Sequence, residues 1–283
     1  MDLSYFISSL ISKKGSNMFF FHSDISKVMG VIPRKRDMKL WLSDHVDFLN
    51  KEFPNGSFIF PSFNYDFLKS GIYDLNESES QVGALSEHFR IHRSCWRSEV
   101  PVFNVTGNNR SIFLKDNLSV FPSGVIDPFD ESSIFQKMYD GNCMVVMYGA
   151  DFSSFTGIHH IESLAGKPLY RYDKLFSGKV VGDGHKDVTL KYHVRPMDIG
   201  LNYRWDFLLD LCVKSGIAHC YNGLSSHLII FSYKEMVDFL LQQVIEDPLF
   251  LIDDESRSKC AEFLDKIGRR FLQSDFESLN ENR

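Results

Sequence analysis

Four short apolar runs, spread along the chain and separated by segments of a different periodicity, most strongly constrain its fold. The runs are MFFFHS (18–23), GSFIFPSF (56–63), NCMVVMYG (142–149) and HLIIFS (227–232). Bounded apolar runs of this length are typical of strands, and the run at 142–149 is typical of a strand buried in a sheet.

Segments with helical periodicity lie between and after these runs. Residues 36–50 place their apolar side chains at helical spacing, and Ser232 with Glu235 forms an S-x-x-E capping box that starts another helix. We expect helices at 36–50, 82–92, 204–216 and 254–273, and after Ser232. The alternation of strands and helices favours an α/β fold.

One pair of segments indicates antiparallel strands. KPLYRYDKLF and KDVTLKYHVR alternate in polarity and flank the glycine-bearing stretch SGKVVGDGH (177–185), which predicts a hairpin. We therefore predict one α/β domain over residues 1–273, a mixed β-sheet flanked by helices, with a polar tail over 274–283 that frays. Loops are expected at 63–80 and 108–131, and a third strand or extended loop at 100–107.

Composition excludes several classes of protein. The 283 residues are 43% hydrophobic, and the net charge of −6 argues against a general nucleic-acid binder, which is usually basic. The five cysteines form no C-x-x-C pair, which favours a reducing compartment over a disulfide framework. The N-terminal stretch lacks the charge order of a secretory signal, and no run approaches the roughly 18 apolar residues of a membrane span. We expect a cytoplasmic protein with no nucleic-acid or membrane partner.

The stretch GADFSSFTGIHHIES (149–163) carries the best candidate for catalysis, where a strand gives way to a helix. His159 and Glu162 are three residues apart and share a helix face, whereas His160 points about 100° away. An imidazole near a helix N-terminus tends to stay neutral and can act as a base, with a carboxylate to stabilise the proton it gains. Asp151, in the preceding turn, could reach the same face.

Other chemistry stays open from the residues alone. His159 and Glu162 could supply two metal ligands, and His22, His185 or His193 a third, but the spacing selects none of them. This leaves a metal-dependent hydrolase as an alternative, and a non-catalytic binding protein as another.

Five segments, in order along residues 18–178, resemble one known family. They are FFHSD (20–24), GSFIFPSFNYDF (56–67), VGALSEHFR (82–90), RSEVP (97–101) and GADFSSFTGIHHIES (149–163). Together they resemble the aminoglycoside 3-N-acetyltransferase family, the antibiotic N-acetyltransferases that use acetyl-CoA. The resemblance implies that family's fold and acyl transfer from acyl-CoA, with acetyl-CoA or a longer acyl-CoA as co-substrate and no metal.

The resemblance also implies roles for individual residues. His159 takes the position of the catalytic base, and Glu162 and Asp151 match the carboxylates that support it. The implied cofactor-binding residues are His22, Ser23, Asp24, Phe63, Arg97, Ser98 and Thr156, and the implied substrate-binding residues are Tyr65, Asp66 and Glu87. The Thr156 hydroxyl or backbone N–H groups of the 22–24 turn would hold the oxyanion.

The C-terminal part points to a particular substrate. From KYHVRPMDIGLNYRW onward the chain is more similar to relatives that N-acylate nucleotide-linked amino sugars for surface polysaccharides than to the drug-modifying members. We therefore expect an amino sugar carried on a nucleotide as acceptor, with an aminoglycoside as the alternative. A homodimer is left open.

Overall fold

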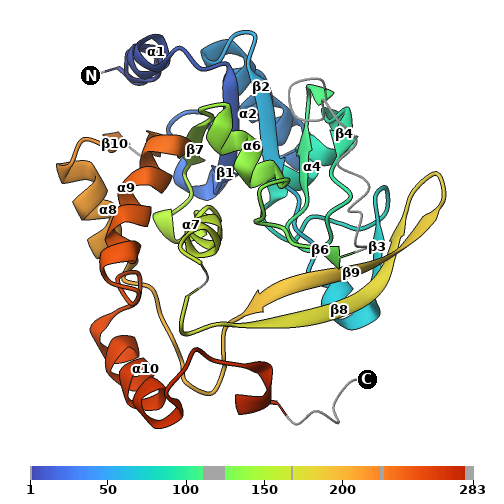
Figure 1. The fold of residues 1–283 in the computed structure, drawn as a ribbon. Coiled ribbons are helices and arrows are strands. Elements are labelled where there is room, and N and C mark those ends of the chain that lie inside the picture. Colours follow the sequence, from blue (N-terminus) through green and yellow to red (C-terminus); the bar gives the residue numbers. More distant parts are fainter. Residues whose placement is uncertain (1, 111–124, 167, 224–225, 278–283) are drawn as a thin grey trace.

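The computed structural model describes residues 2–110, 125–166, 168–223 and 226–277, and its largest element is a sheet of seven strands (Figure 1). In their order across the sheet, the described strands are β10 (Ala218–Gly223), β11 (Ser226–Ser232), β7 (Met144–Tyr148), β1 (Met18–Ser23), β2 (Ser57–Pro61), β5 (Val105–Gly107) and β4 (Trp96–Arg97). The four strands expected from the apolar runs are all present, and β10 is a strand that the sequence did not predict.

The centre of this sheet is parallel and its edges are antiparallel. Strand β1 pairs in parallel with β2 and β7, whereas β11 runs antiparallel to β7 and β5 antiparallel to β2. The prediction of a mixed sheet in an α/β fold is therefore confirmed. Because parallel strands end at the same edge, the carboxyl ends of β1, β2 and β7 lie side by side, where open α/β sheets usually bind ligands.

Each face of the sheet is covered by helices, because side chains along a strand alternate between the two faces. Phe20 and Val145 pack into one core with α6 (Ile134–Asp140), α7 (Ile158–Leu164), α8 (Trp205–Lys214) and α9 (Tyr233–Glu246). Phe21 and Val146 pack into another core with α1 (Leu3–Lys14), α2 (Met38–Glu52) and α4 (Ala84–His92). Figure 1 shows α6, α7 and α9 in front of the sheet and α2 behind it.

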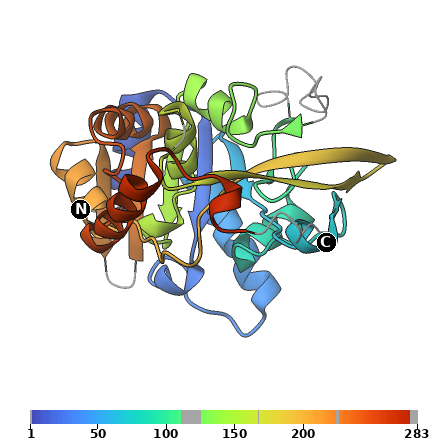
Figure 2. The same ribbon diagram turned by 60° about the horizontal axis from the view of Figure 1, so that its bottom comes forward.

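A second sheet of four described strands contains the predicted hairpin. Its order is β3 (Ile72–Asp74), β8 (Tyr172–Val181), β9 (His185–Val194) and β6 (Val125–Ile126). The turn occupies 182–184 only, so the strands extend further into the glycine-bearing stretch than the sequence indicated. The hairpin projects from the body of the molecule (Figure 2). Strand β3 of this second sheet, together with α3 (Phe67–Ser70), lies in the segment expected to be a loop.

The C-terminal part forms a smaller core around α10 (Asp254–Ile267). This helix ends at Gly268, which has a φ of 66°, so it is shorter than the expected 254–273. Of the tail expected to fray over 274–283, residues 274–277 are described, and they contact β8. The ring of Phe276 stacks on Tyr172 with centroids 5.5 Å apart, and the Glu277 carboxylate accepts hydrogen bonds of 2.5 Å from Tyr172 and Lys174.

Two expectations from the sequence, that no segment spans a membrane and that the cysteines form no disulfide framework, can be compared with the described residues. No helix among them is long and apolar enough to cross a bilayer. All five cysteines are free.

The turn after β7 is packed tightly against the turn after β1. Gly149 has a φ of 75°, and a Cβ at this position would lie 2.1 Å from the carbonyl oxygen of Asp24. The backbone N–H of Asp24 in turn donates to the carbonyl of Tyr148 at 2.9 Å. The close approach therefore requires glycine, and it fixes the edge of the sheet where β1 and β7 end.

We expect Gly149→Ala to destabilise the protein more than Gly216→Ala. Gly216 has a similar φ of 71°, but a Cβ there would meet no atom within 4 Å, so its substitution costs only the left-handed backbone, about 1–2 kcal/mol. At Gly149 the clash should add about 1–3 kcal/mol. Urea unfolding of both variants measures the difference, and equal losses would contradict the packing described.

Candidate active site

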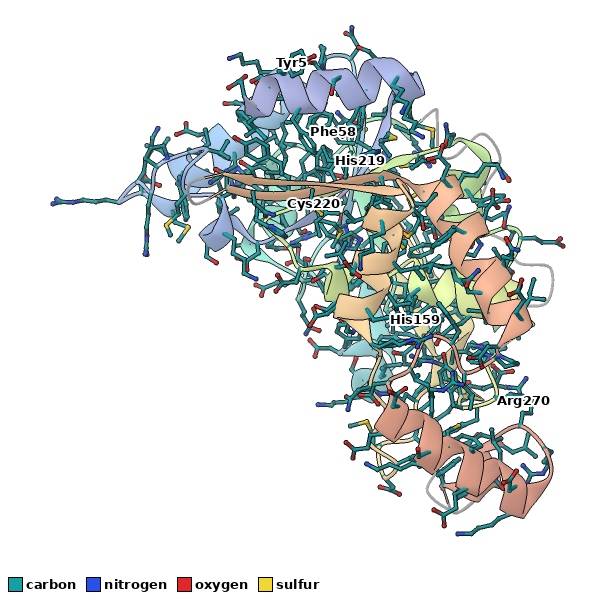
Figure 3. All side chains as sticks on the ribbon, turned by 90° about the vertical axis from the view of Figure 1, so that its left-hand side faces the viewer. Tyr5, Phe58, His159, His219, Cys220 and Arg270 are labelled. Carbon is teal, nitrogen blue, oxygen red and sulfur yellow. The ribbon has the colours of Figure 1, made fainter. Side chains whose placement is uncertain are left out.

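A cavity of about 610 Å³ opens at the edge where the three parallel strands end. Its walls come from the residues that follow β1, β2 and β7, from the start of α4, and from Phe103 and Trp205. His159 is part of this wall and lies between the main sheet and α10 (Figure 3).

The short helix α7 brings His159 to the cavity. The chain leaves β7, forms a turn of 3₁₀ helix (Phe152–Ser154), and enters α7 with Gly157 at the N-cap position. A side chain at Gly157 would come within 2.3 Å of the Phe155 ring and 2.8 Å of Tyr233. The helix thus begins slightly later than the Ser154–Thr156 start that the sequence suggested.

The imidazole of His159 is oriented by a buried carboxylate. His159 Nδ1 donates a hydrogen bond of 2.9 Å to Glu162 Oε2, because an ionised carboxylate can only accept. The Glu162 side chain is 0% exposed and His159 is 21% exposed. With Nδ1 engaged in this way, Nε2 carries the lone pair that can accept a proton.

Three further side chains surround the Glu162 carboxylate. Tyr170 and Tyr203 each donate a hydroxyl hydrogen bond to Oε1, at 2.9 Å and 2.6 Å. Arg171 Nε lies 3.2 Å from Oε1 and 3.1 Å from Oε2, and the same guanidinium donates to the hydroxyl of Tyr203 at 2.5 Å. The negative charge therefore has a cation and several donors around it, as a buried charge requires.

These neighbours set the ionisation of both members of the pair. Burial alone would raise the pKa of Glu162, but Arg171 and the hydrogen bond from His159 hold that pKa well below its ordinary value. Burial lowers the pKa of His159, Arg171 lowers it further, and Glu162 only partly opposes them. His159 is therefore neutral at pH 7, next to a carboxylate that stabilises the proton it would gain.

Aromatic rings enclose the imidazole of His159. Phe129, Phe103 and Tyr203 have ring centroids 5.7, 5.9 and 6.3 Å from that of His159. The packing leaves the ring little rotational freedom, which suits a base that must be held in one geometry.

Many of the residues suggested by the sequence meet in the cavity. Those that line it together with His159 are His22, Ser23, Asp24, Phe63, Tyr65 and Thr156. They come from the ends of β1 and β2 and from the turn before α7, so the parallel strand ends bring them together.

Arg97 and Ser98 are placed elsewhere, in the support of the sheet edge. The Arg97 guanidinium donates to the carbonyls of Ser78 (2.6 Å) and Ser62 (2.9 Å), and lies 5.0 Å from the centre of the Tyr73 ring. The Ser98 hydroxyl accepts from the backbone N–H of Val105 at 2.9 Å. Neither residue lines the cavity with His159, because their polar groups are committed to the chain around them.

The three remaining acids are not placed beside the imidazole either. Glu87 pairs with Arg90 at 2.6 Å, and Asp66 lies at the start of α3. Asp151 pairs with Lys27 at 2.5 Å, and its side chain is 60% exposed. Of the two carboxylates suggested as supports for the base, Glu162 makes the hydrogen bond to His159 and Asp151 does not.

Sequence reasoning did not find the residues that surround Glu162. Tyr170 and Arg171 precede β8 and were assigned only to the hairpin, while Tyr203 lies in the C-terminal stretch that was used only to infer the substrate class. A buried carboxylate needs a cation nearby, but the sequence does not say which of 31 Lys and Arg residues supplies it.

The second histidine of the pair has a different environment. His160 is 0% exposed, and its ring nitrogens lie 3.1 Å from the Tyr233 hydroxyl and 3.2 Å from Gln136 Oε1. It joins α7 to α9 and α6 and does not line the cavity. Within the described ranges, no group of three or more His, Cys, Asp and Glu side chains is arranged to hold a metal ion.

Comparison with known proteins gives one family and a set of similar structures. The family model described as aminoglycoside 3-N-acetyltransferase matches residues 54–244. AAC(3)-Xa is similar in structure with a TM-score of 0.65 and 15% identity over 86% of this chain and 92% of that chain. A mutant of AAC(3)-IVa in complex with a gentamicin has a TM-score of 0.64 and 18% identity, over 90% of this chain and 94% of that chain.

A third similar structure is a binary complex of AAC-IIIb with CoASH, with a TM-score of 0.63 and 15% identity over 87% of this chain and 97% of that chain. At these identities the likeness concerns the fold. No curated protein matches the sequence.

We expect Glu162→Gln to reduce stability at pH 7 by about 3–5 kcal/mol, because it leaves the buried Arg171 without its carboxylate. The pKa of Glu162 is lowered in the folded state, so its contribution is complete above the unfolded value of about 4.3 and is lost as the pH falls below it. The gap between wild type and variant should therefore shrink in acid.

The matched control is Asp151→Asn, which removes an exposed carboxylate paired with Lys27 and should cost at most about 1 kcal/mol. Urea unfolding at several pH values measures both variants. Equal losses for the two, or a gap that widens in acid, would contradict the role assigned to Glu162.

Proposed function

Because the chain belongs to the aminoglycoside 3-N-acetyltransferase family, and is therefore a CoA-dependent N-acyltransferase, we propose that it acylates an amino sugar with His159 as general base. The single observation that carries this proposal is the His159–Glu162 pair, buried on one side and open to a large cavity on the other. The CoASH complex of AAC-IIIb supports acyl-CoA, carrying acetyl or a longer acyl group, as the donor.

Proton transfer is the part of the reaction that the geometry explains. A sugar amine is largely an ammonium ion at pH 7, and it must lose a proton before its nitrogen can attack a thioester carbonyl. His159 Nε2 takes that proton, and the Glu162 carboxylate stabilises the resulting imidazolium through Nδ1.

Attack then forms the carbon–nitrogen bond and breaks the carbon–sulfur bond of the acyl-CoA. The imidazolium of His159 returns its proton to the departing thiolate, and the nitrogen of the tetrahedral intermediate releases its remaining extra proton to solvent. The products are the amide and free CoA. Holding amine and thioester together in one cavity supplies much of the rate.

The lining of the main cavity supports an acceptor that is not a polycation. Among the described residues of this lining the one acid is Asp24, and the acidic stretch YDLNESES (73–80) does not contribute. A polycationic aminoglycoside would be expected to select a strongly acidic cleft.

A neighbouring cavity of about 570 Å³ shares Ser153 and Trp205 with the first. Its wall includes Arg204, whose guanidinium stacks 4.2 Å from the ring centres of Phe207 and Phe250. Arginine and aromatic faces suit phosphates and a nucleobase. They support a nucleotide-linked amino sugar of the kind used for surface polysaccharides.

Three acids also line the neighbouring cavity, and two of them are already engaged. Asp151 pairs with Lys27, and Asp253 accepts the backbone N–H of Ser256 at the start of α10. Of these three acids, Asp206 is the one least engaged with other groups of the described chain. The alternative acceptor is an aminoglycoside, which the family description and the gentamicin complex of AAC(3)-IVa favour.

We expect His159→Ala to lower kcat for acyl transfer by about 10²- to 10⁴-fold, because it removes the proton acceptor. His160→Gln is the matched control, since this neighbouring histidine does not line the cavity, and it should keep kcat near that of wild type. Release of CoA thiol measures both. Near-normal turnover by His159→Ala would exclude the assignment.

The pH dependence should follow from the same residue. The base is active when neutral, and the pKa of His159 is lowered from its ordinary 6.5 by burial. We therefore expect kcat/KM to rise with pH along a limb centred below pH 6.5 and to be level above it, until another group titrates. A limb centred well above 6.5 would contradict the environment described for His159.

A panel of acceptors would identify the substrate class. With acetyl-CoA as donor, we expect kcat/KM for a nucleotide-linked amino sugar to exceed that for gentamicin by about tenfold or more. Arg204→Met should raise KM for the nucleotide sugar without raising it for aminoglycosides. Turnover of aminoglycosides alone would reverse the assignment.

A further inference from the structure

A second histidine faces the same cavity and has no hydrogen-bond partner among the described residues. His22, near the end of β1, is 4% exposed and lines the cavity together with His159. Its Nε2 is sealed from solvent and bonds to no group in the part of the chain that the structure describes. Buried polar side chains are nearly always paired, so an unpaired imidazole on a cavity wall needs an explanation.

The surroundings of His22 exclude the role that His159 plays. Burial lowers the pKa of His22 to about 3, so the ring is neutral throughout the working range of such an enzyme. Its neighbour Asp24 could have stabilised a proton, but that carboxylate accepts from the backbone N–H and the hydroxyl of Ser26, at 3.1 and 2.6 Å. His22 is therefore suited to donate a hydrogen bond as a neutral ring and not to take up a proton.

The two ring nitrogens of His22 are not equivalent. Nε2 is the sealed one, so Nδ1 is the nitrogen that can reach the cavity. A buried N–H without an acceptor is rarer in proteins than a buried acceptor without a donor. The tautomer with hydrogen on Nδ1 therefore fits the site better, and it presents an N–H to whatever occupies the cavity.

Acyl transfer needs such a donor. The thioester oxygen becomes an oxyanion during the reaction, and donors aimed at it are usually among the largest contributions to catalysis. The backbone N–H of Asp24, in the turn where the sequence suggested donors, is already bonded to the carbonyl of Tyr148 at 2.9 Å. The side chain of His22 offers a donor beside that turn.

The position of His22 is also a rigid one. It lies in a strand of the central sheet, paired with Met147 of β7, and its ring packs 4.5 Å from the ring of Phe20 at 68°. A donor held on a strand keeps its direction better than one on a loop.

We propose that His22, as a neutral imidazole, donates a hydrogen bond from Nδ1–H to the thioester carbonyl oxygen and stabilises the oxyanion while His159 handles the proton. This inference rests on the proposed function, because it assumes acyl transfer in this cavity. It assigns different tasks to the two histidines: one carries a proton, and the other holds a developing charge without titrating.

Three substitutions test the inference. In Asn the amide nitrogen can occupy the place of Nδ1, in Gln it reaches nearer the place of Nε2, and Leu offers no donor. We expect His22→Leu to lower kcat by about 10²- to 10³-fold with little change in KM for acetyl-CoA. His22→Asn should recover at least about tenfold of that loss, and His22→Gln should not.

Further readouts separate catalysis from structure. Thermal unfolding shows whether each variant is folded. If the Leu variant does not fold, the comparison of the folded Asn variant with the Gln variant carries the test. The low-pH limb assigned to His159 should remain in all active His22 variants. A rise in KM with unchanged kcat, or equal kcat for the Asn and Leu variants, would overturn the inference.

The same assay distinguishes this inference from the proposed function. If His159→Ala is inactive while the His22 variants keep wild-type kcat, only the role of His22 is wrong. If His159→Ala keeps wild-type kcat, or wild type acylates no amine in the panel, the proposed function fails and the role of His22 fails with it.

Discussion

The arrangement of the site depends on one buried carboxylate. Glu162 is shielded from water, and it remains an anion because Arg171 supplies a counter-charge and two tyrosines supply donors. This cluster joins α7, which packs on the main sheet, to the start of β8 in the second sheet and to the segment before α8. Leaving either partner of this buried ion pair without the other is costly, so the cluster favours the arrangement in which both are in place. It therefore fixes how the two sheets meet as well as the direction of the imidazole.

The three histidines of this region differ in their electrostatic surroundings. His159 has a carboxylate on one nitrogen and the cavity on the other, so it can gain and lose a proton. His160 has neutral partners on both nitrogens and serves packing. His22 has no charged partner among the described residues, and burial keeps it neutral. Identical side chains within one small volume thus differ in the chemistry open to them.

The parts of this protein that were predictable from sequence are those governed by local rules. Apolar runs indicated the central strands, and the three-residue spacing of His159 and Glu162 indicated that these two side chains meet, because both features depend on neighbours along the chain. The resemblance seen in short motifs is confirmed by the family match over 54–244.

Contacts between residues far apart in the sequence could not be predicted. Asp151 lies only eight residues before His159, yet it pairs with Lys27 and not with the imidazole. Arg97 was expected among the cofactor-binding residues, but its guanidinium donates to carbonyls of distant loops, and the sequence does not reveal these partners.

The chain order of the Glu162 cluster has a consequence for how the enzyme is made. His159 and Glu162 lie on a single turn of helix and can meet as soon as that turn forms. Tyr170, Arg171 and Tyr203 are all synthesised after it, and the hairpin of β8 and β9 lies between Arg171 and Tyr203 along the chain. A nascent chain that has not reached Tyr203 can thus contain His159 and Glu162 without all of the side chains that set their pKa values. The pair is local, but its surroundings are complete only when the second sheet is packed on the first.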